Sequence, residues 1–216
     1  MTTGLVDELP DVAGLRERWG REVLHCPHCH GWEVRDQPIG VLASGPFAVH
    51  QTLLFSQWTD DLVLFLHTVP TPGADQLEQL AARGVRVVAG AVQSLVTTDD
   101  RLSGVRLVDG TVVPRRVIVV GPRFVARAEM LICLGLEVTE NEFGTFVAAD
   151  AMGQTALPGV WVAGNVADPR AQVIGAAAAG VNVAAAVNAD LIRADVALAV
   201  SASRARAAGS VSSPAV

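Results

Sequence analysis

The residues most able to do chemistry lie together in the heptapeptide His25–Gly31, in which two residues separate Cys26 from Cys29 and three histidines surround them. A Cys-x-x-Cys pair can close an easily reduced disulfide, and a neighbouring imidazole can hold a thiolate or move a proton near neutral pH. In disulfide exchange one thiolate reacts with the substrate while the other faces a redox partner, and a base must accept the proton. His30, next to Cys29, is the candidate for that base.

The same side chains are also zinc ligands, so half of a Cys2His2 site is the alternative. The histidines lie within one residue of a cysteine, however, and the usual zinc pattern has two well separated ligand pairs. The spacing therefore favours a redox dithiol, and no metal site is predicted. His25 and His28 are expected to be satisfied by local hydrogen bonds.

Composition narrows the class of protein. The chain has 216 residues, half of them apolar, a net charge of −6, no lysine and only scattered arginines. Nucleic-acid binding needs a concentrated basic surface, so we exclude it. The N-terminus lacks a basic region followed by an apolar one, and three cysteines make no secreted disulfide framework, which predicts a cytoplasmic protein. Cys133, in an apolar run, is expected to be buried and inert.

The alanine-rich stretch 173–200 is apolar enough to suggest a membrane span. Asn182, Asp190, Arg193 and Asp195 interrupt it, and a central charge costs roughly 2.5–3.5 kcal/mol on insertion scales. We therefore expect a long, mostly buried helix of a soluble protein and no membrane partner.

The elements that would position the dithiol begin with two apolar runs of strand length, 39–42 and 62–66, joined by a turn and a periodic stretch over 47–58. A helix over 73–83 and a β-branched run over 85–88 repeat the pattern. Strand, helix and strand in this order predict βαβ units with parallel strands that are buried on both faces. A nucleotide-binding half-domain is the natural expectation.

A different pattern follows this unit. Short segments separated by turns predict an antiparallel meander, with a hairpin at Asp109-Gly110 whose two central residues would have positive φ. Farther along we expect strands over 117–120 and 160–164, a helix over 125–134, the long alanine-rich helix, and a disordered tail from Ser201.

The positions that would bind a nucleotide lack most of the residues that usually do so. Of the two glycines that begin a G-x-G-x-x-G/A loop only Gly45 is present, because Ala43 stands at the first position. His67 follows the next strand, where an acidic residue or arginines would contact a ribose or its phosphate. These departures argue against a nicotinamide nucleotide. Gly164-Asn165, before the long helix, could instead seat an anionic or ribityl-type group.

In this order the motifs resemble the thioredoxin reductase-like flavoproteins of the pyridine nucleotide-disulfide oxidoreductase class. Cys26-Pro27-His28-Cys29 matches the redox-active disulfide of that family, and Gly164-Asn165 lies where the family has the Gly-Asp that contacts FAD. The resemblance implies an FAD cofactor, a dithiol or disulfide substrate that is a small molecule or a protein, and a homodimer. It also implies cofactor contacts from Gly45, Gly164, Asn165, Gln172 and Val173.

Two departures refine this resemblance. Reductases of this family usually carry an aspartate after the second cysteine, where this chain has His30. The resulting Cys-x-x-Cys-His-Gly run resembles the branch of dithiol oxidases, which pass electrons through FAD to oxygen. This resemblance makes NADP a doubtful cofactor. The family also begins with an FAD-binding βαβ unit that is not found before Gly4. The difference implies a truncated product, a misassigned start or half of a split enzyme.

We therefore expect an α/β fold: a Rossmann-like three-layer nucleotide-binding domain with a small antiparallel meander, plus the C-terminal part of a second, FAD-binding domain. The expected division is a linker segment from the FAD-type domain (1–22), a pyridine-nucleotide-like domain with the CxxC motif (23–120), the C-terminal part of the FAD-type domain (121–196) and a disordered tail (197–216). The predicted function is an FAD-dependent thiol/disulfide oxidoreductase, either a dithiol oxidase or a thioredoxin reductase-like enzyme. The prediction includes a truncated or inactive form of such an enzyme. The alternative is a non-enzymatic domain that binds zinc through the dithiol or binds a partner.

Overall fold

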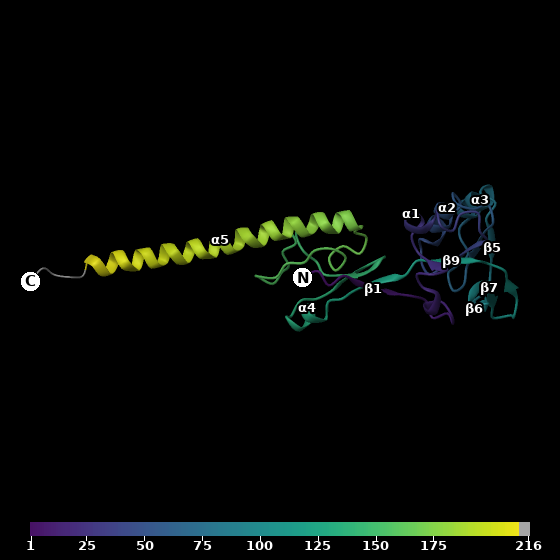
Figure 1. Cartoon of the computed structure of the whole chain (residues 1–216), viewed down its shortest axis with the longest axis horizontal. Helices are drawn as coiled ribbons and strands as arrows, with labels where there is room; N and C mark the ends of the chain where they lie inside the picture. The colour runs from purple at the N-terminus through teal and green to yellow at the C-terminus, as the bar shows by residue number, and fades with distance from the viewer. Residues whose placement is uncertain (212–216) are drawn as a thin grey trace, which may run out of the picture. The chain divides into compact units, whose positions relative to one another are not determined.

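The computed structural model describes residues 1–211 and divides the chain into two compact units (Figure 1). Unit 2 is Glu8–Arg123, and unit 1 combines Met1–Asp7 with the chain from Phe124 onward. The boundary differs from the expected one, because residues 8–22 belong to unit 2. Val12 and Leu15 explain this difference, since both are buried in a core cluster with residues of the meander.

Unit 2 is built on a parallel five-stranded sheet with the order β2-β9-β3-β4-β5. The predicted βαβ units are confirmed, with helices α2 and α3 as the crossovers. The sheet and its helices comprise β2 (Val23–Leu24), β3 (Ile39–Leu42), α2 (Ala48–Phe55), β4 (Leu62–Phe65), α3 (Ala74–Ala82), β5 (Arg86–Val88) and β9 (Val117–Val120).

Alternation along these strands produces three layers. In β4, Leu62 and Leu64 join a core cluster with α2 and α3 on one face, while Val63 and Phe65 join a cluster with the meander on the other. Every residue of β3, β4 and β9 is buried. Burial on both faces is the reason that these strands are continuously apolar rather than alternating in sequence.

The meander packed on this sheet consists of β6 (Val92–Thr98), β7 (Arg101–Leu107) and β8 (Val112–Val113). Its turns differ from the prediction. Asp99 and Asp100, between β6 and β7, are the pair with positive φ, at 50° and 56°. At the second turn only Gly110 has a positive φ, and Asp109 accepts a hydrogen bond from the Thr111 amide. Gly110 alone therefore supplies the left-handed residue of a longer hairpin loop.

Unit 1 contains a mixed sheet with the order β1-β10-β12-β11, formed by β1 (Leu5–Glu8), β10 (Arg123–Ala126), β12 (Gly144–Phe146) and β11 (Thr139–Asn141). The helix expected over 125–134 is wrong in its first half, because β10 includes Val125 and the helix is the short α4 (Glu129–Cys133). The strand expected over 160–164 is reduced to one bridge at Trp161. The Ala163 amide bonds to the Met1 carbonyl instead of to a sheet strand.

The long helix α5 (Val173–Val211) is exposed along most of its length, so the expectation of a mostly buried helix is wrong. It also continues through residues 201–211, which were expected to be disordered; Ala and Arg, abundant there, are strong helix formers. The rest of that predicted tail, 212–216, lies outside the described residues. Within residues 1–211, no helix combines the length and apolarity that a membrane span requires.

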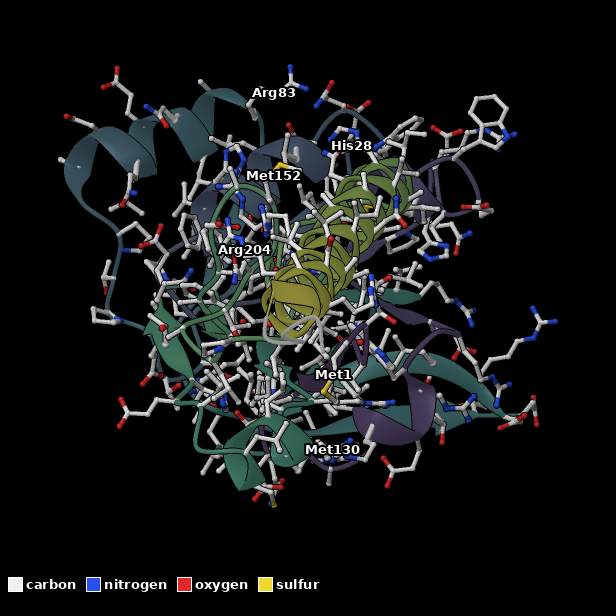
Figure 2. All side chains as sticks on the ribbon, turned by 90° about the vertical axis from the view of Figure 1, so that its left-hand side faces the viewer. Met1, His28, Arg83, Met130, Met152 and Arg204 are labelled. Atoms are coloured by element: carbon white, nitrogen blue, oxygen red, sulfur yellow. A yellow bond between two sulfur atoms is a disulfide. The ribbon has the colours of Figure 1, made fainter. Side chains whose placement is uncertain are left out.

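Cys133 is exposed, contrary to expectation. The short helix α4 buries Leu131 and leaves Met130 and Ile132 exposed. Figure 2 shows the exposed Met130 side chain. The prediction failed because an apolar run does not show which of its residues are buried, and α4 buries only one side.

Candidate functional site

The cysteine motif lies at the carboxyl edge of the parallel sheet in unit 2. We call residues His25–Gly31 the disulfide turn; it begins directly after β2. Gly121 follows β9 and Ser44 lies just beyond β3, and these strands are neighbours in the sheet. Parallel pairing brings the ends of all three strands to the same edge, which is where ligand sites of open α/β sheets are found.

Cys26 and Cys29 form a disulfide whose Cα atoms are 5.3 Å apart. They are joined by one helical turn, α1 (Pro27–His30), with Cys26 as its N-cap residue in an extended conformation and Pro27 at the first helical position. The His30 amide donates to the Cys26 carbonyl at 3.2 Å. One helical turn brings residues three apart to the same side, so this local structure follows from the spacing and from proline's preference for the first turn.

Gly31 ends the turn because no side chain would fit there. A Cβ atom at Gly31 would overlap the indole of Trp58 and the Pro27 carbonyl. Its φ of −59° is an ordinary helical value, so close packing rather than backbone conformation explains the glycine. The indole therefore holds the disulfide turn against the rest of unit 2.

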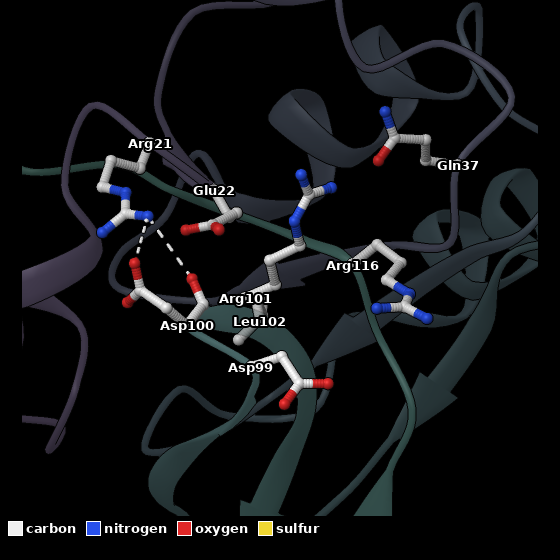
Figure 3. Close-up of a pocket in the computed structure, with 8 residues that line it drawn as sticks. All are labelled: Arg21, Glu22, Gln37, Asp99, Asp100, Arg101, Leu102 and Arg116. Carbon is white, nitrogen blue, oxygen red and sulfur yellow. Dashed lines mark hydrogen bonds and ion pairs between the residues drawn. The ribbon is translucent and has the colours of Figure 1, made fainter.

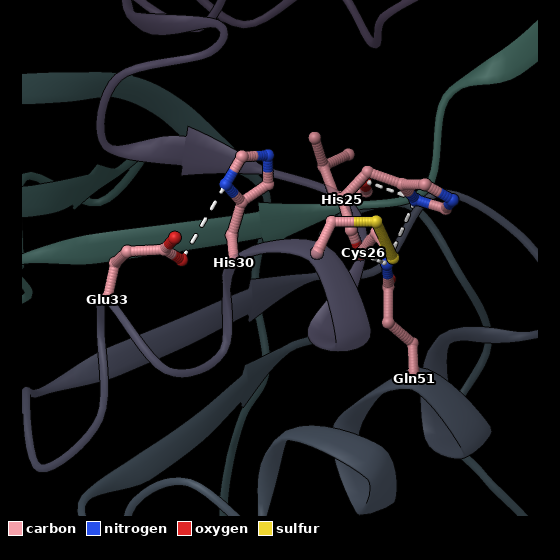
Figure 4. Close-up of a disulfide and its surroundings, with 7 residues drawn as sticks. His25, Cys26, His30, Glu33 and Gln51 are labelled. Carbon is pink, nitrogen blue, oxygen red and sulfur yellow. Dashed lines mark hydrogen bonds and ion pairs between the residues drawn. A yellow bond between two sulfur atoms is a disulfide. The ribbon is translucent and has the colours of Figure 1, made fainter. Parts of the chain in front are cut away.

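The imidazoles beside the disulfide have different surroundings (Figure 4). His30 is half exposed, and its Nδ1 lies 3.8 Å from the Glu33 carboxylate. His28 is exposed. His30 thus lies next to the disulfide, open to solvent and beside a carboxylate, as a base for an incoming thiol should be. Its role as that base stays a prediction.

His25 lies on the other side of the disulfide and makes polar contacts with the sheet edge and with α2 (Figure 4). Its Nδ1 is 3.3 Å from the Val120 carbonyl and 3.3 Å from Gln51 Nε2, and Gln51 Nε2 also donates to the His25 carbonyl at 3.0 Å. The partners lie 26 and 95 residues away in the sequence, so these contacts are not the local hydrogen bonds that were expected. Gln51 was not predicted, because an amide between His50 and Thr52 in a helical stretch gives no signal in the sequence of its contact with the disulfide turn.

The expected nucleotide loop contains Gly45 in open space, since apart from Gly45 and its chain neighbours no atom of the described residues lies within 4 Å of the place that a Cβ would occupy. Ser44 Oγ donates to the Gly121 carbonyl at 2.6 Å, so this side chain closes the loop onto the end of β9. A nucleotide contact from Gly45 stays a prediction.

His67, after β4, occupies the place where a ribose ligand would be supplied. It adopts φ 52°, and its Nδ1 accepts a hydrogen bond from the Val92 amide at 3.0 Å. Burial lowers the pKa of His67 below its ordinary value. A neutral imidazole that is already bonded to the meander is a poor group for holding a phosphate.

The remaining predicted cofactor residues are in unit 1, on the loop that enters α5. Gly164 has φ 78°, and Asn165 Nδ2 donates to the Ala171 carbonyl at 2.9 Å, so the asparagine organises its own loop. The Gln172 carbonyl accepts from Ala176 in the first turn of α5. Val173, the first residue of that helix, is 88% exposed.

This loop fits one end of a flavin. The first amides of a helix have no intrahelical acceptor and favour an electron-rich group, as the edge of a flavin ring provides. Val173 and Ile174, 88% and 80% exposed, offer apolar contact to the same ligand. Gly164 lets a ligand approach the backbone closely.

A pocket of about 630 Å³ lies at the opposite, amino edge of the sheet in unit 2 (Figure 3). Glu22, Gln37 and Arg116, which line it, precede strands β2, β3 and β9. Hydrogen bonds from Arg21 and then Arg18 hold the pKa of Asp100 below its usual range. These ion pairs tie residues 18–22 to the turn between β6 and β7, and the pocket carries opposite charges side by side.

Among residues 1–211, no group of three or more His, Cys, Asp or Glu side chains has an arrangement that could hold a metal ion.

Comparison with known proteins places these features in a family. The family described as pyridine nucleotide-disulphide oxidoreductase matches residues 1–180. A thioredoxin reductase of Leptosphaeria maculans, sirT, is 30% identical over 210 residues, which cover 91% of this chain and 64% of that protein. The chain thus spans less than two thirds of this relative's length.

Two solved structures are also similar. The crystal structure of HlmI is 48% identical with a TM-score of 0.85, covering 95% of this chain and 64% of HlmI. An oxidoreductase from Agrobacterium tumefaciens is 35% identical with a TM-score of 0.80, covering 88% of this chain and 63% of that protein. The Rossmann-like α/β fold is thereby confirmed, and the chain belongs to the pyridine nucleotide-disulphide oxidoreductase family.

Proposed function

We propose that this chain carries the dithiol–disulfide exchange centre of a flavin-dependent oxidoreductase of the dithiol-oxidase kind. The observation that supports it best is the Cys26–Cys29 disulfide at the carboxyl edge of the sheet, with the half-exposed His30 beside it. The substrate would be a dithiol, either a small molecule or a segment of a protein.

The exchange step follows from the chemistry of the turn. A substrate thiol loses its proton to His30, and the thiolate attacks one sulfur of the disulfide, forming a mixed disulfide and releasing the other cysteine as a thiolate. The second substrate thiolate then displaces the remaining cysteine. The substrate leaves as a disulfide, Cys26 and Cys29 are reduced by two electrons, and the two substrate protons end on the cysteine thiols or in solvent.

The family generally binds FAD, and we infer that Gly164, Asn165, Gln172 and Val173 would hold one end of it in this chain. Bound flavin supplies a two-electron acceptor for the reduced cysteines. We further infer that no nicotinamide nucleotide takes part, since Ala43 replaces the first loop glycine and His67 is bonded to the meander. The homodimer and the cytoplasmic location expected from the sequence stay predictions.

The test uses the full chain in its oxidised form. Anaerobic incubation with dithiothreitol, followed by removal of the reagent and thiol counting, should show a gain of two thiols per chain. Cys26→Ser and Cys29→Ser should lose the whole gain, whereas Cys133→Ser should keep it, because Cys133 is outside the disulfide. A chain whose cysteines do not exchange, but which binds Zn²⁺ stoichiometrically through them, would support the non-enzymatic alternative instead.

A further inference from the structure

Gln51 is a buried polar side chain on the helix that follows the nucleotide-type loop. It belongs to α2, and only 9% of it is exposed. A buried amide without partners is costly, so the partners of Gln51 indicate what its place in the core achieves. Those partners belong to a different element, the disulfide turn.

The Gln51 amide nitrogen donates to the His25 carbonyl and also lies beside a ring nitrogen of His25. Nε2 lies 3.0 Å from the His25 carbonyl and 3.3 Å from His25 Nδ1. An NH₂ group has two hydrogens, so the two contacts can be made together. The reverse orientation of the amide would set two oxygens against each other, so the carbonyl contact determines the orientation.

This orientation has a consequence for the His25 ring. Nδ1 lies at 3.3 Å from the Val120 carbonyl, an acceptor, and at 3.3 Å from Gln51 Nε2, a donor. A protonated Nδ1 would bond to Val120 and face an N–H of Gln51, whereas an unprotonated Nδ1 accepts from Gln51. The two contacts therefore favour opposite forms: Val120 favours a hydrogen on Nδ1, whereas Gln51, whose amide is held in place by its bond to the His25 carbonyl, favours the neutral ring that carries its hydrogen on Nε2.

We propose that Gln51 is a positioning residue for the disulfide turn, which fixes the His25 carbonyl and selects the Nε2–H form of the His25 ring. This inference rests on the proposed function. The His25 carbonyl belongs to the peptide that enters Cys26, so anchoring it holds the first cysteine in the extended conformation from which α1 begins. The opposite side of the turn is held by Gly31 against Trp58. The disulfide is thus fixed on both sides while His30 stays open to solvent.

The first experiment reads the ring directly. Long-range ¹⁵N–¹H correlation spectra distinguish the two neutral forms of histidine, and five histidines can be assigned by substitution. In the oxidised full chain we expect unprotonated Nδ1 at His25. Gln51→Leu should move the hydrogen to Nδ1, facing Val120, and Gln51→Glu should do the same, because a carboxylate accepts from Nδ1–H. Observing protonated Nδ1 in the parent chain would overturn the proposal.

The second experiment reads the disulfide. We expect the second-order rate constant for reduction by dithiothreitol to fall about tenfold in Gln51→Leu, a change equivalent to about 1.4 kcal/mol. Gln57→Leu is the matched control, because Gln57 lies just after the same helix and donates to the Leu54 carbonyl there, and its rate should stay within about twofold. Equal rates in all three chains, with unchanged His25 spectra, would refute a positioning role.

The two proposals can fail separately. If the parent disulfide does not react with dithiols, the proposed function fails, while the ring spectra still decide whether Gln51 sets the form of His25. If Gln51→Leu does not fold, Gln51→Glu keeps the side-chain size and provides both measurements.

Discussion

The disulfide turn and the loop 164–173 both lead from a β segment into a helix, but their polar groups find partners in different places. The disulfide turn is held by other elements: Gln51 from α2, the Val120 carbonyl from β9 and the indole of Trp58. In the loop, the Asn165 side chain bonds within the loop, to the Ala171 carbonyl, while Val166 anchors the segment through its buried side chain and a hydrogen bond from the Val147 amide. The helix after the loop begins with exposed apolar residues.

The disulfide turn is therefore rigidly packed, whereas the loop 164–173 leads to a helix start that is exposed. The disulfide turn has its conformation set by the packing of unit 2, so its reactive pair is organised without a ligand. The loop is held by Asn165 and by the buried Val166, and Val173 and Ile174 beyond it stay exposed. The reactive cysteines of unit 2 are therefore preorganised by packing, whereas the loop of unit 1 keeps surface open to a ligand.

The largest expected effect on stability comes from disrupting the packing of the disulfide turn. Gly31→Ala should destabilise unit 2 by about 2–3 kcal/mol, because the added methyl group overlaps Trp58 and the Pro27 carbonyl. Urea unfolding followed by tryptophan fluorescence would measure it. Gly45→Ala is the matched control, since a methyl group there meets open space, and we expect a change below about 1 kcal/mol. Equal effects of the two substitutions would mean that the turn is not held by packing.

A smaller effect should appear with pH. His67 has its pKa lowered by burial, so the folded chain stays neutral there while the unfolded chain takes up a proton as the pH falls through about 6.5. This contribution to stability is fully present above 6.5 and declines as the pH falls toward the folded pKa. The exposed part of the ring keeps the change below about 1 kcal/mol.

His67→Asn tests this origin of the pH dependence. Asparagine tolerates a positive φ and can accept the Val92 hydrogen bond, so the variant should fold and should unfold with a flatter pH dependence between about 7.5 and 5.5. His50→Asn, on the exposed side of α2, should leave the dependence as it is in the parent chain. A parent and a His67→Asn chain with the same slope would rule out His67 as its source.

The smallest effect on stability should come from a substitution at the exposed start of α5. Val173→Asp should change the free energy of unfolding by less than about 0.5 kcal/mol, since the residue is 88% exposed. The same substitution should weaken FAD binding, measured by flavin fluorescence, because it places a carboxylate at the entry of α5. Val196→Asp, also exposed on α5, should leave binding unchanged. A loss of stability above about 1 kcal/mol would show that Val173 is packed.

The sequence predicted the elements whose environment is uniform. Strands β3, β4 and β9 were recognisable because burial on both faces requires an uninterrupted apolar run, and the cysteine spacing indicated the disulfide. The run 160–164 has the same appearance but not the same structure, because Ala163 bonds to Met1 rather than to a sheet neighbour. Composition cannot distinguish these two outcomes, since both bury apolar side chains.

The candidate site was predictable only in its reactive atoms. Cysteine and histidine have chemistry that is visible in a sequence, whereas Gln51 acquires a role only when α2 is placed beside the disulfide turn. Trp58 is similar, because its contact with Gly31 joins residues that no local pattern connects. Residues that support a site depend on tertiary contacts and were therefore missed.

The ion pair between Glu8 and Arg123, at 3.1 Å, has a consequence for the order of folding. These residues are 115 apart in sequence and stand at the two ends of unit 2, so unit 2 is an insertion between β1 and its sheet neighbour β10. Closing so long a loop in an unfolded chain carries an entropic cost. A folded unit 2 has already brought its ends together. We therefore expect β1, although it precedes unit 2 in the chain, to pair with β10 only after unit 2 has folded.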